Sequence, residues 1–347
     1  MMMKILPILL TALILCGCGH TPVREYHPAA LPPHPAEDSV TQERADKLSD
    51  LLAPLDVRGA VIFPSAVFGR FETSAVLDAL AHCNFNRIYC HITSEQELDK
   101  NLRNFIISAR ERDFDVEIVI SQMDFYRKYQ VNQVIRKAVI QFPSLVDTAK
   151  LVAEFNAELP ENRRLNGITV HVTPHLYNGK NVRRMYGSIY CWSANSYGKG
   201  EDNDMLMRQT FETLKEIAAI ENLPVLTVAV PDFMHERAKK GDLSIGTVKD
   251  FAAITPRVAM VNTANLPSQL AENIAGELAD APEKSQILAV IPLASHISID
   301  SARLRRRNWN DFIRAVENTV AVSKKSPAFN GVILSPFSVV EYLRLEK

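Results

Sequence analysis

The sequence lacks the short motifs that mark several common classes of enzyme. It has no P-loop, no Gly-x-Ser-x-Gly elbow and no Cys-x-x-Cys pair, and no strand-like run is followed by a glycine-rich phosphate turn. Nucleotide binding, α/β-hydrolase chemistry and thioredoxin-like redox chemistry therefore have no local support. An excess of one charge is also missing, because the formal net charge is -1 at pH 7. Nothing in the bulk charge indicates a nucleic-acid partner.

The remaining composition is that of an ordinary globular protein. The chain has 347 residues, of which 47% are hydrophobic and 23% are charged. This length is sufficient for one large α/β domain or for two smaller domains, each with a substantial core.

The N-terminus has the composition of a secretory signal. Lys4 precedes an apolar run from Ile5 to Leu15, which is too short to span a bilayer. The segment Leu15-Cys16-Gly17-Cys18 that follows resembles a bacterial lipobox. The resemblance implies cleavage before Cys18, removal of residues 1–17 and lipid on the Cys18 sulfur. The alternative is an ordinary signal peptide with an accidental cysteine.

A proline-rich segment separates this cysteine from the predicted domain. Residues 18–36 read as a lipidated cysteine and a semi-extended tether, and residues 37–347 as a single folded domain. Gly19 rather than Asp follows Cys18. For a host with the usual Gram-negative sorting habit, this favours the outer membrane, on its periplasmic face or at the cell surface. We therefore expect a membrane partner and a location in a bacterial cell envelope.

Three cysteines remain after the signal, namely Cys83, Cys90 and Cys191. Because three is odd, at most one disulfide forms within the chain. A bond between Cys83 and Cys90 and a set of three free apolar thiols both fit the sequence.

The rest of the chain alternates between short β-branched runs and helical patterns, which is typical of buried parallel strands joined by crossover helices. The predicted strands are Gly59–Phe63, Arg87–Ile92, Val116–Ser121, Gly167–Thr173, Val225–Val230, Val258–Asn262, Ile287–Leu293 and Gly331–Ser335. The predicted helices are Ser39–Leu52, Thr73–His82, Ser94–Arg112, Ser144–Leu159, Asp204–Glu221, Ile245–Ala253, Pro267–Ala279, Trp309–Ser323 and Ser338–Leu345. This pattern predicts an α/β fold, the (β/α)8 TIM barrel. A doubly wound open sheet is the alternative, although no dinucleotide fingerprint supports it.

The strand from Gly167 to Thr173 alternates cleanly between two faces. Ile168, Val170 and Val172 occupy one face, whereas Thr169, His171 and Thr173 occupy the other. We expect the apolar face to meet the helices, and the polar face to line the interior and reach the mouth of the barrel.

A long aromatic loop follows this strand, from about residue 174 to residue 202. It contains Tyr190 and Trp192 together with further tyrosines and basic residues. A loop of this length at the active end of a barrel usually shapes a ligand cleft, and flat rings stack on sugar faces. The alternative is a loop that packs on its own aromatic side chains.

The strand itself resembles the fourth strand of chitinase-like enzymes, the family 18 glycoside hydrolases, and their relatives. The family carries Asp-Gly-Ile-Asp-x-Asp-x-Glu there, and a related bacterial group carries Gly-Ile-His-x-Asp-x-Glu-Pro-His. Gly167, Ile168, Pro174 and His175 match the second pattern. The segments Glu154-Phe155-Asn156, Met260-Val261-Asn262 and Asn330-Gly331-Val332-Ile333-Leu334-Ser335 look similar too. The resemblance implies the barrel fold and a polysaccharide or oligosaccharide ligand.

The catalytic acids of the family are missing from this strand. Where the family has its inward Asp and its acid Glu, the chain has His171 and Thr173. Glycoside hydrolysis normally needs a carboxyl group to protonate the leaving oxygen. We therefore expect a catalytically degenerate barrel that binds a glycan through His91, His171, Thr173, His175, Tyr190 and Trp192.

Other residues are alternative catalysts of a rearranged hydrolase site. Asp124 and Asp232 follow the third and fifth strands, where they suit either acid–base work or helix capping. Glu117 is expected to point into the barrel beside Tyr89, His91, Thr169 and His171, either as a catalytic acid or in a hydrogen-bond network with histidine. His171 completes the candidates for catalysis.

No cofactor and no metal are predicted. His91, His171, His175, Asp232 and His296 all fall near strand ends, where they would suit zinc. The first strand, however, carries no His-x-His pair. A third hypothesis is a scaffold that holds other envelope proteins and binds no sugar.

Overall fold

The computed structural model describes most of the domain but not its termini or several loops. The described residues are 39–68, 71–92, 94–121, 134–135, 138–139, 145–172, 200–241, 243–262, 267–292 and 309–335. The predicted signal, lipidation site and tether lie outside them, as does the predicted helix Ser338–Leu345.

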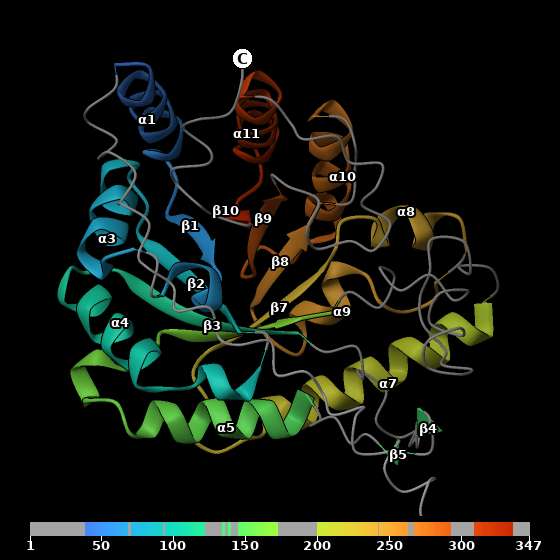
Figure 1. The fold of residues 1–347 in the computed structure, drawn as a ribbon. Coiled ribbons are helices and arrows are strands. Elements are labelled where there is room, and N and C mark those ends of the chain that lie inside the picture. Colours follow the sequence, from blue (N-terminus) through green and yellow to red (C-terminus); the bar gives the residue numbers. More distant parts are fainter. Residues whose placement is uncertain are drawn as a thin grey trace, which may run out of the picture.

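Eight parallel strands close into a barrel, and the helices surround it (Figure 1). The strands are β1 (Val57–Ile62), β2 (Arg87–Ile92), β3 (Asp115–Ser121), β6 (Gly167–His171), β7 (Leu226–Pro231), β8 (Arg257–Val261), β9 (Gln286–Pro292) and β10 (Phe329–Ser335). Their order around the barrel is β1-β10-β9-β8-β7-β6-β3-β2. The TIM-barrel prediction is therefore confirmed. The open doubly wound alternative is wrong, because β1 pairs with both β2 and β10 and so closes the sheet.

The helices follow the predicted alternation closely. The longer ones are α1 (Ser39–Leu52), α3 (Thr73–His82), α4 (Lys100–Glu111), α5 (Leu145–Ala157), α7 (Gly200–Ala218), α10 (Pro267–Asp280) and α11 (Trp309–Ser323). The shorter ones are α2 (Pro64–Val67), α8 (Met234–Lys239), α9 (Val248–Ala252) and the 3-10 turns η2 (Glu95–Glu97) and η3 (Glu161–Arg163). A small hairpin, β4 (Val134–Ile135) with β5 (Ala138–Val139), stands apart from the barrel sheet. The sequence patterns predicted neither α2, nor α8, nor this hairpin.

The helix expected from Ser94 to Arg112 is divided into two parts. Ser94 and Glu97 do form the predicted capping box, but it caps the 3-10 turn η2. The side chain of Asp99 then accepts hydrogen bonds from the backbone N–H groups of Asn101 and Leu102 and begins α4. A second N-cap so soon after the first starts the helix anew, because its carboxylate satisfies the first free N–H groups.

The barrel wall separates two apolar clusters. The larger cluster lies between strands and helices and includes Ile168, Val170 and Val172, which are fully buried. Each such side chain contributes about 1.5–3 kcal/mol of burial free energy. The smaller cluster lies inside the barrel and includes Tyr89 and Leu288. The predicted division of the fourth barrel strand between a helix-facing side and an interior side is thus confirmed.

The described cysteines, Cys83 and Cys90, are both buried and free. Of the two alternatives, a bond between Cys83 and Cys90 is therefore wrong, and Cys191 lies outside the described residues. None of the helices that the structure describes is both long and apolar enough to cross a membrane.

Candidate functional site

At the end of the barrel where the strands finish, a few polar side chains lie beside apolar ones. We call this end the mouth, and its described inward side chains include Phe63, His91, Ser121 and His171. His91 lies near the end of β2, and Ser121 and His171 end the adjacent strands β3 and β6. Period-two alternation places these side chains inside, whereas the residues between them face the helices. In TIM-barrel enzymes this end is the active face.

The two histidines are held in specific positions. His91 Nε2 lies 2.8 Å from Ser121 Oγ, so these two atoms share a hydrogen bond. The His91 ring lies 4.9 Å from the ring of Phe63 and 6.2 Å from the ring of His171. His171 Nε2 is buried and has no hydrogen-bond partner among the described residues. Among the described residues, the mouth therefore holds one imidazole fixed by a serine and a second one whose buried Nε2 has no hydrogen-bond partner.

Both imidazoles are neutral near physiological pH. Burial lowers the pKa of His91 to about 4, an effect that the negative charge of Glu97 opposes. Burial, and then the neighbouring His91, lower the pKa of His171 to about 3. The charged form of each ring would lose its hydration inside the barrel, which is the physical cause of both shifts.

Glu97 lies near the mouth, although the sequence pattern marked it only as a helix cap. Its carboxylate accepts a hydrogen bond from the Ser94 backbone N–H at 3.2 Å, and it also acts electrostatically on His91. The turn that follows β2 brings it there. The Ser94/Glu97 spacing predicts the capping box, but no sequence signal places the carboxylate near the mouth.

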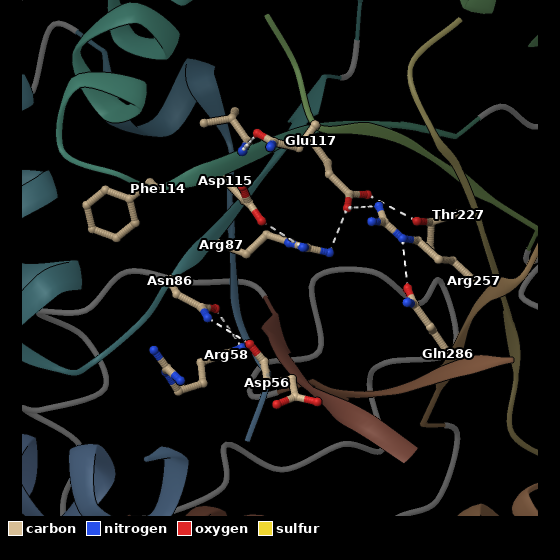
Figure 2. A network of polar contacts seen from close by, with 12 residues as sticks. Asp56, Arg58, Asn86, Arg87, Phe114, Asp115, Glu117, Thr227, Arg257 and Gln286 are labelled. Carbon is tan, nitrogen blue, oxygen red and sulfur yellow. Dashed lines mark hydrogen bonds and ion pairs between the residues drawn. The ribbon is translucent and has the colours of Figure 1, made fainter. Parts of the chain in front are cut away.

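Glu117 lies at the opposite end of the barrel, near the beginnings of the strands (Figure 2). Its Oε2 accepts hydrogen bonds from the hydroxyls of Thr169, at 2.8 Å, and Thr227, at 3.2 Å. Its Oε1 accepts from Arg87 at 3.2 Å and from Arg257 at 3.4 Å. Burial raises the pKa of this carboxyl, and the two guanidiniums oppose the rise.

This arrangement corrects one expectation and confirms another. Glu117 does point into the barrel, but its partners are two arginines and two threonines rather than histidine. His91 and His171 stand further along their strands, so that Ser121, and not Glu117, pairs with His171 in the strand register. Side chains at this end of a TIM barrel serve stability rather than catalysis.

Asp232 is buried immediately after β7, outside the interior of the barrel. Its side chain accepts a hydrogen bond from Asn273 of α10 at 3.2 Å, and it lies close enough to Glu277 of that helix to raise the Glu277 pKa. Alternation from the inward Ala229 also turns Asp232 toward the helices. The structure therefore does not bring Asp232 together with His171.

The other predicted site residues lie outside the described residues. These are Asp124, Thr173, His175, Tyr190 and Trp192, and the same holds for His296 and the long aromatic loop. Within the described part of the chain, no group of three or more His, Cys, Asp or Glu side chains could hold a metal ion.

Comparisons with known proteins add little beyond the fold. No protein-family model matches the chain, and no curated protein matches it. Among solved structures, it is similar to a xylanase-α-amylase inhibitor protein in complex with trehalose (14% identity, 80% of this chain and 92% of the other, TM-score 0.39). A chitinase from Chromobacterium violaceum matches at 16% identity over 68% of this chain and 69% of the other, with a TM-score of 0.34.

A third similar structure is an intracellular xylanase from Thermoanaerobacterium saccharolyticum in complex with xylotriose. It matches at 11% identity over 87% of this chain and 91% of the other, with a TM-score of 0.43. Values this low carry no argument about activity. The closed strand order itself defines the architecture, a single (β/α)8 barrel.

Proposed function

We propose that the protein binds a neutral saccharide at the mouth of its barrel and does not cleave it. The observation that carries this proposal is the state of His91 and His171. Both rings are buried at the mouth, both are neutral, and His171 Nε2 has no hydrogen-bond partner among the described residues.

The chemistry of a neutral imidazole suits a sugar hydroxyl. Such a ring has one donor and one acceptor nitrogen, and a hydroxyl group both donates and accepts. A buried, unpaired polar atom costs about 1–3 kcal/mol, which a ligand hydroxyl at His171 Nε2 would recover. The ring of Phe63 beside His91 adds an aromatic surface of the kind on which sugars pack.

The same pKa values argue against acid catalysis by these residues. With pKa values of about 4 and about 3, only roughly one ring in a thousand or fewer is protonated at pH 7. Such a group is a poor proton donor to a glycosidic oxygen and also a weak base. Glu117, the buried carboxyl inside the barrel, lies at the opposite end and is engaged by two arginines.

The proposal also includes the residues expected from the sequence beyond the described part. Thr173 and His175 follow His171 closely in the sequence and would add polar groups to the site, and Tyr190 and Trp192 would supply stacking platforms. Lipid on Cys18 would hold the barrel at a bacterial envelope membrane. The support for this anchor is the lipobox-like segment and the proline-rich residues after it.

Binding and cleavage are tested in the same tubes. The purified protein is incubated with bacterial, plant and host polysaccharides, and both ligand depletion and new reducing ends are measured. We expect depletion without new reducing ends. His171→Gln should weaken binding about tenfold, the loss of roughly one hydrogen bond. Glu283→Ala, an exposed position far from the mouth, is the matched control.

Two results would overturn the proposal in different directions. New reducing ends from the wild type would show a working hydrolase with a rearranged site, and Asp124→Asn, Asp232→Asn and Glu117→Gln would then be assayed. Neither binding nor cleavage across the panel would favour the scaffold hypothesis. The anchor is tested separately by incorporation of labelled palmitate, which Cys18→Ala should abolish.

A further inference from the structure

Ser121 and His91 at the mouth form a hydroxyl–imidazole pair of the kind that nucleophilic hydrolases use. His91 Nε2 lies 2.8 Å from Ser121 Oγ. The β3 partner of His91 in the strand register is Val119, and Ser121 is the next inward residue of β3 toward the mouth. Ser121 is partly exposed, whereas His91 is buried. A molecule that binds at the mouth therefore approaches the hydroxyl before the imidazole.

The His91 ring is in the state that can accept the proton of this hydroxyl. Burial lowers its pKa to about 4, so the ring is neutral at pH 7. When the hydrogen is on Nδ1, Nε2 is the acceptor that faces Ser121 Oγ. The negative charge of Glu97 acts on the ring and favours the protonated form that a proton transfer would create. A base with so low a pKa is weak, so we expect slow turnover.

His171 stands on the other side of Ser121. The two residues are partners in the strand register of β3 and β6, and neighbouring strands lie roughly 4.8 Å apart. His171 Nε2 is buried and has no hydrogen-bond partner among the described residues. In the tautomer with hydrogen on Nε2, this atom donates a hydrogen bond to an oxygen bound beside Ser121. Acyl transfer needs such a donor, because the carbonyl oxygen becomes negatively charged when the nucleophile attacks.

From this arrangement we propose that the mouth hydrolyses an uncharged carboxylic ester, with Ser121 as nucleophile, His91 as general base and His171 as the donor to the carbonyl oxygen. Ser121 Oγ forms a bond to the acyl carbon, and its proton passes to His91 Nε2. The ester C–O bond then breaks, and the alcohol leaves with that proton. Water next attacks the acyl carbon and gives a proton to His91 Nε2. The carboxylic acid is released as this proton returns to Ser121 Oγ.

The buried neutral rings favour an uncharged substrate, because a charge beside them would lose its hydration. The bond that breaks is an ester bond, so glycosidic bonds stay intact and no new reducing ends form. That the ester is an acyl group carried by a saccharide rests on the proposed function, whereas the chemistry of Ser121 and His91 does not. A simple ester such as p-nitrophenyl acetate therefore tests this chemistry separately from saccharide binding.

The nucleophile is tested with a fluorophosphonate probe, which forms a covalent bond with activated serines. The full-length protein is labelled at pH 7 and digested, and the adduct is located by mass spectrometry. We expect an adduct on Ser121, none at this position in Ser121→Ala, and labelling at least tenfold slower in His91→Asn. Ser74→Ala, which changes an exposed serine of α3, should label like wild type. Hydrolysis of p-nitrophenyl acetate should follow the same order.

Two substitutions at one position test the donor. His171→Leu removes the N–H group and should lower p-nitrophenyl acetate hydrolysis about 100-fold, whereas His171→Gln keeps an N–H group and should retain more activity. Circular dichroism verifies that each variant is folded.

The outcomes separate this inference from the proposed function. An absence of adduct on Ser121 in the folded wild-type protein, or equal hydrolysis by wild type and Ser121→Ala, would overturn the ester hydrolase. Ester hydrolysis through Ser121 without any saccharide binding would support it and overturn the proposed function. Saccharide binding with neither adduct nor ester hydrolysis would do the reverse.

Discussion

The ring of His171 lies edge-on to the ring of His91, with centroids 6.2 Å apart and an angle of 78° between the planes. The two histidines come from β2 and β6, which are separated in the barrel only by β3. Protonation of either ring would place a charge beside the other inside a desolvated space. Stability and ligand binding at this end of the molecule should therefore respond to acid in a defined way.

The first prediction concerns acid stability. Each histidine has a pKa near 6.5 when unfolded and a lower pKa when folded, so the unfolded state takes up protons first. The stabilisation is fully present above pH 6.5 and is lost as pH falls toward 4 for His91 and 3 for His171. As the pH falls from 7 to 5, each histidine should lower the free energy of unfolding by about 2 kcal/mol.

Urea unfolding at pH 7 and pH 5 measures this loss. His91→Asn and His171→Asn should each reduce the pH dependence relative to wild type, and the exposed variant Gln96→Asn should not. A pH dependence that both histidine variants share with wild type would contradict the buried neutral state. Ligand binding, by the same reasoning, should be constant between pH 6 and pH 8.

A second prediction concerns the carboxylate between Arg87 and Arg257. Glu117→Ala leaves both guanidiniums without their buried partner, and removal of one member of such a group costs about 3–5 kcal/mol. Glu117→Gln should cost less, because the amide oxygen can still accept hydrogen bonds. Denaturant unfolding measures both. Glu317→Gln breaks an exposed ion pair with Lys47 and should change stability by less than about 1 kcal/mol.

Saccharide binding separates the structural role of Glu117 from a catalytic one. At a temperature where Glu117→Gln remains folded, binding at the distant mouth should equal that of wild type. Selective loss of turnover or binding in a folded Glu117→Gln protein would instead assign this residue to a site.

The third prediction concerns Gly167, the glycine at which β6 begins. A Cβ at Gly167 would lie 2.7 Å from Glu117 Cδ and 2.9 Å from the Val225 carbonyl oxygen. The ion pairs hold Glu117 in place, and hydrogen bonding between the strands holds the Val225 carbonyl. Gly167→Ala should therefore destabilise the protein by about 1–3 kcal/mol, as overpacking does.

Thermal unfolding compares this variant with Gly241→Ala. Gly241 has a φ of +77°, and a Cβ added there would meet nothing within 4 Å. Only backbone strain of roughly 1 kcal/mol is therefore expected at this position. If the two variants melted alike, packing against Glu117 would not be the reason for Gly167.

The fourth prediction concerns Glu277, a fully buried residue of α10. Its Oε1 accepts a hydrogen bond from the His235 backbone N–H of α8 at 2.8 Å, and burial raises its pKa to about 8. Because the folded state holds this proton more tightly, the stabilisation is complete below about pH 4.5 and is lost as pH rises to 8. From pH 5 to pH 7 the loss should be about 2.5 kcal/mol.

Glu277→Gln keeps the shape and removes the titration. Unfolding measured at pH 5, 7 and 9 should show that the variant loses less stability than wild type as pH rises. Glu272→Gln, an exposed position on the same helix, should follow the wild-type profile. If the stability of Glu277→Gln followed the wild-type dependence on pH, the Glu277 carboxyl would have its ordinary pKa in the folded protein.

The fifth prediction concerns the buried thiols. Burial raises the pKa of Cys83 to about 12 and raises that of Cys90 further. Thiolates are the reactive species, so neither side chain should react with a disulfide reagent in the folded Cys191→Ser protein. Both should react once the chain is unfolded in urea. Rapid reaction of the folded protein would contradict the burial of these residues.

Spacing along the chain was enough to predict the succession of strands and helices. A period of two in runs such as Ile168, Val170 and Val172, with helical patterns between the runs, predicted all eight barrel strands within a few residues. The Ser94/Glu97 spacing likewise predicted a capping box that the structure contains. These are properties of neighbours along the chain, because burial of alternate side chains and capping of free N–H groups depend on local spacing.

Which side chains meet, in contrast, follows from the closed barrel and could not be predicted from local spacing. Closure sets the strand register, which carries Glu117 to Arg87, Arg257 and two threonines, and leaves His91 and His171 together at the other end. Packing against α10 turns the side chain of Asp232 toward the helices and away from the barrel interior. Such contacts join residues far apart in sequence, and their geometry exists only once all the strands have paired.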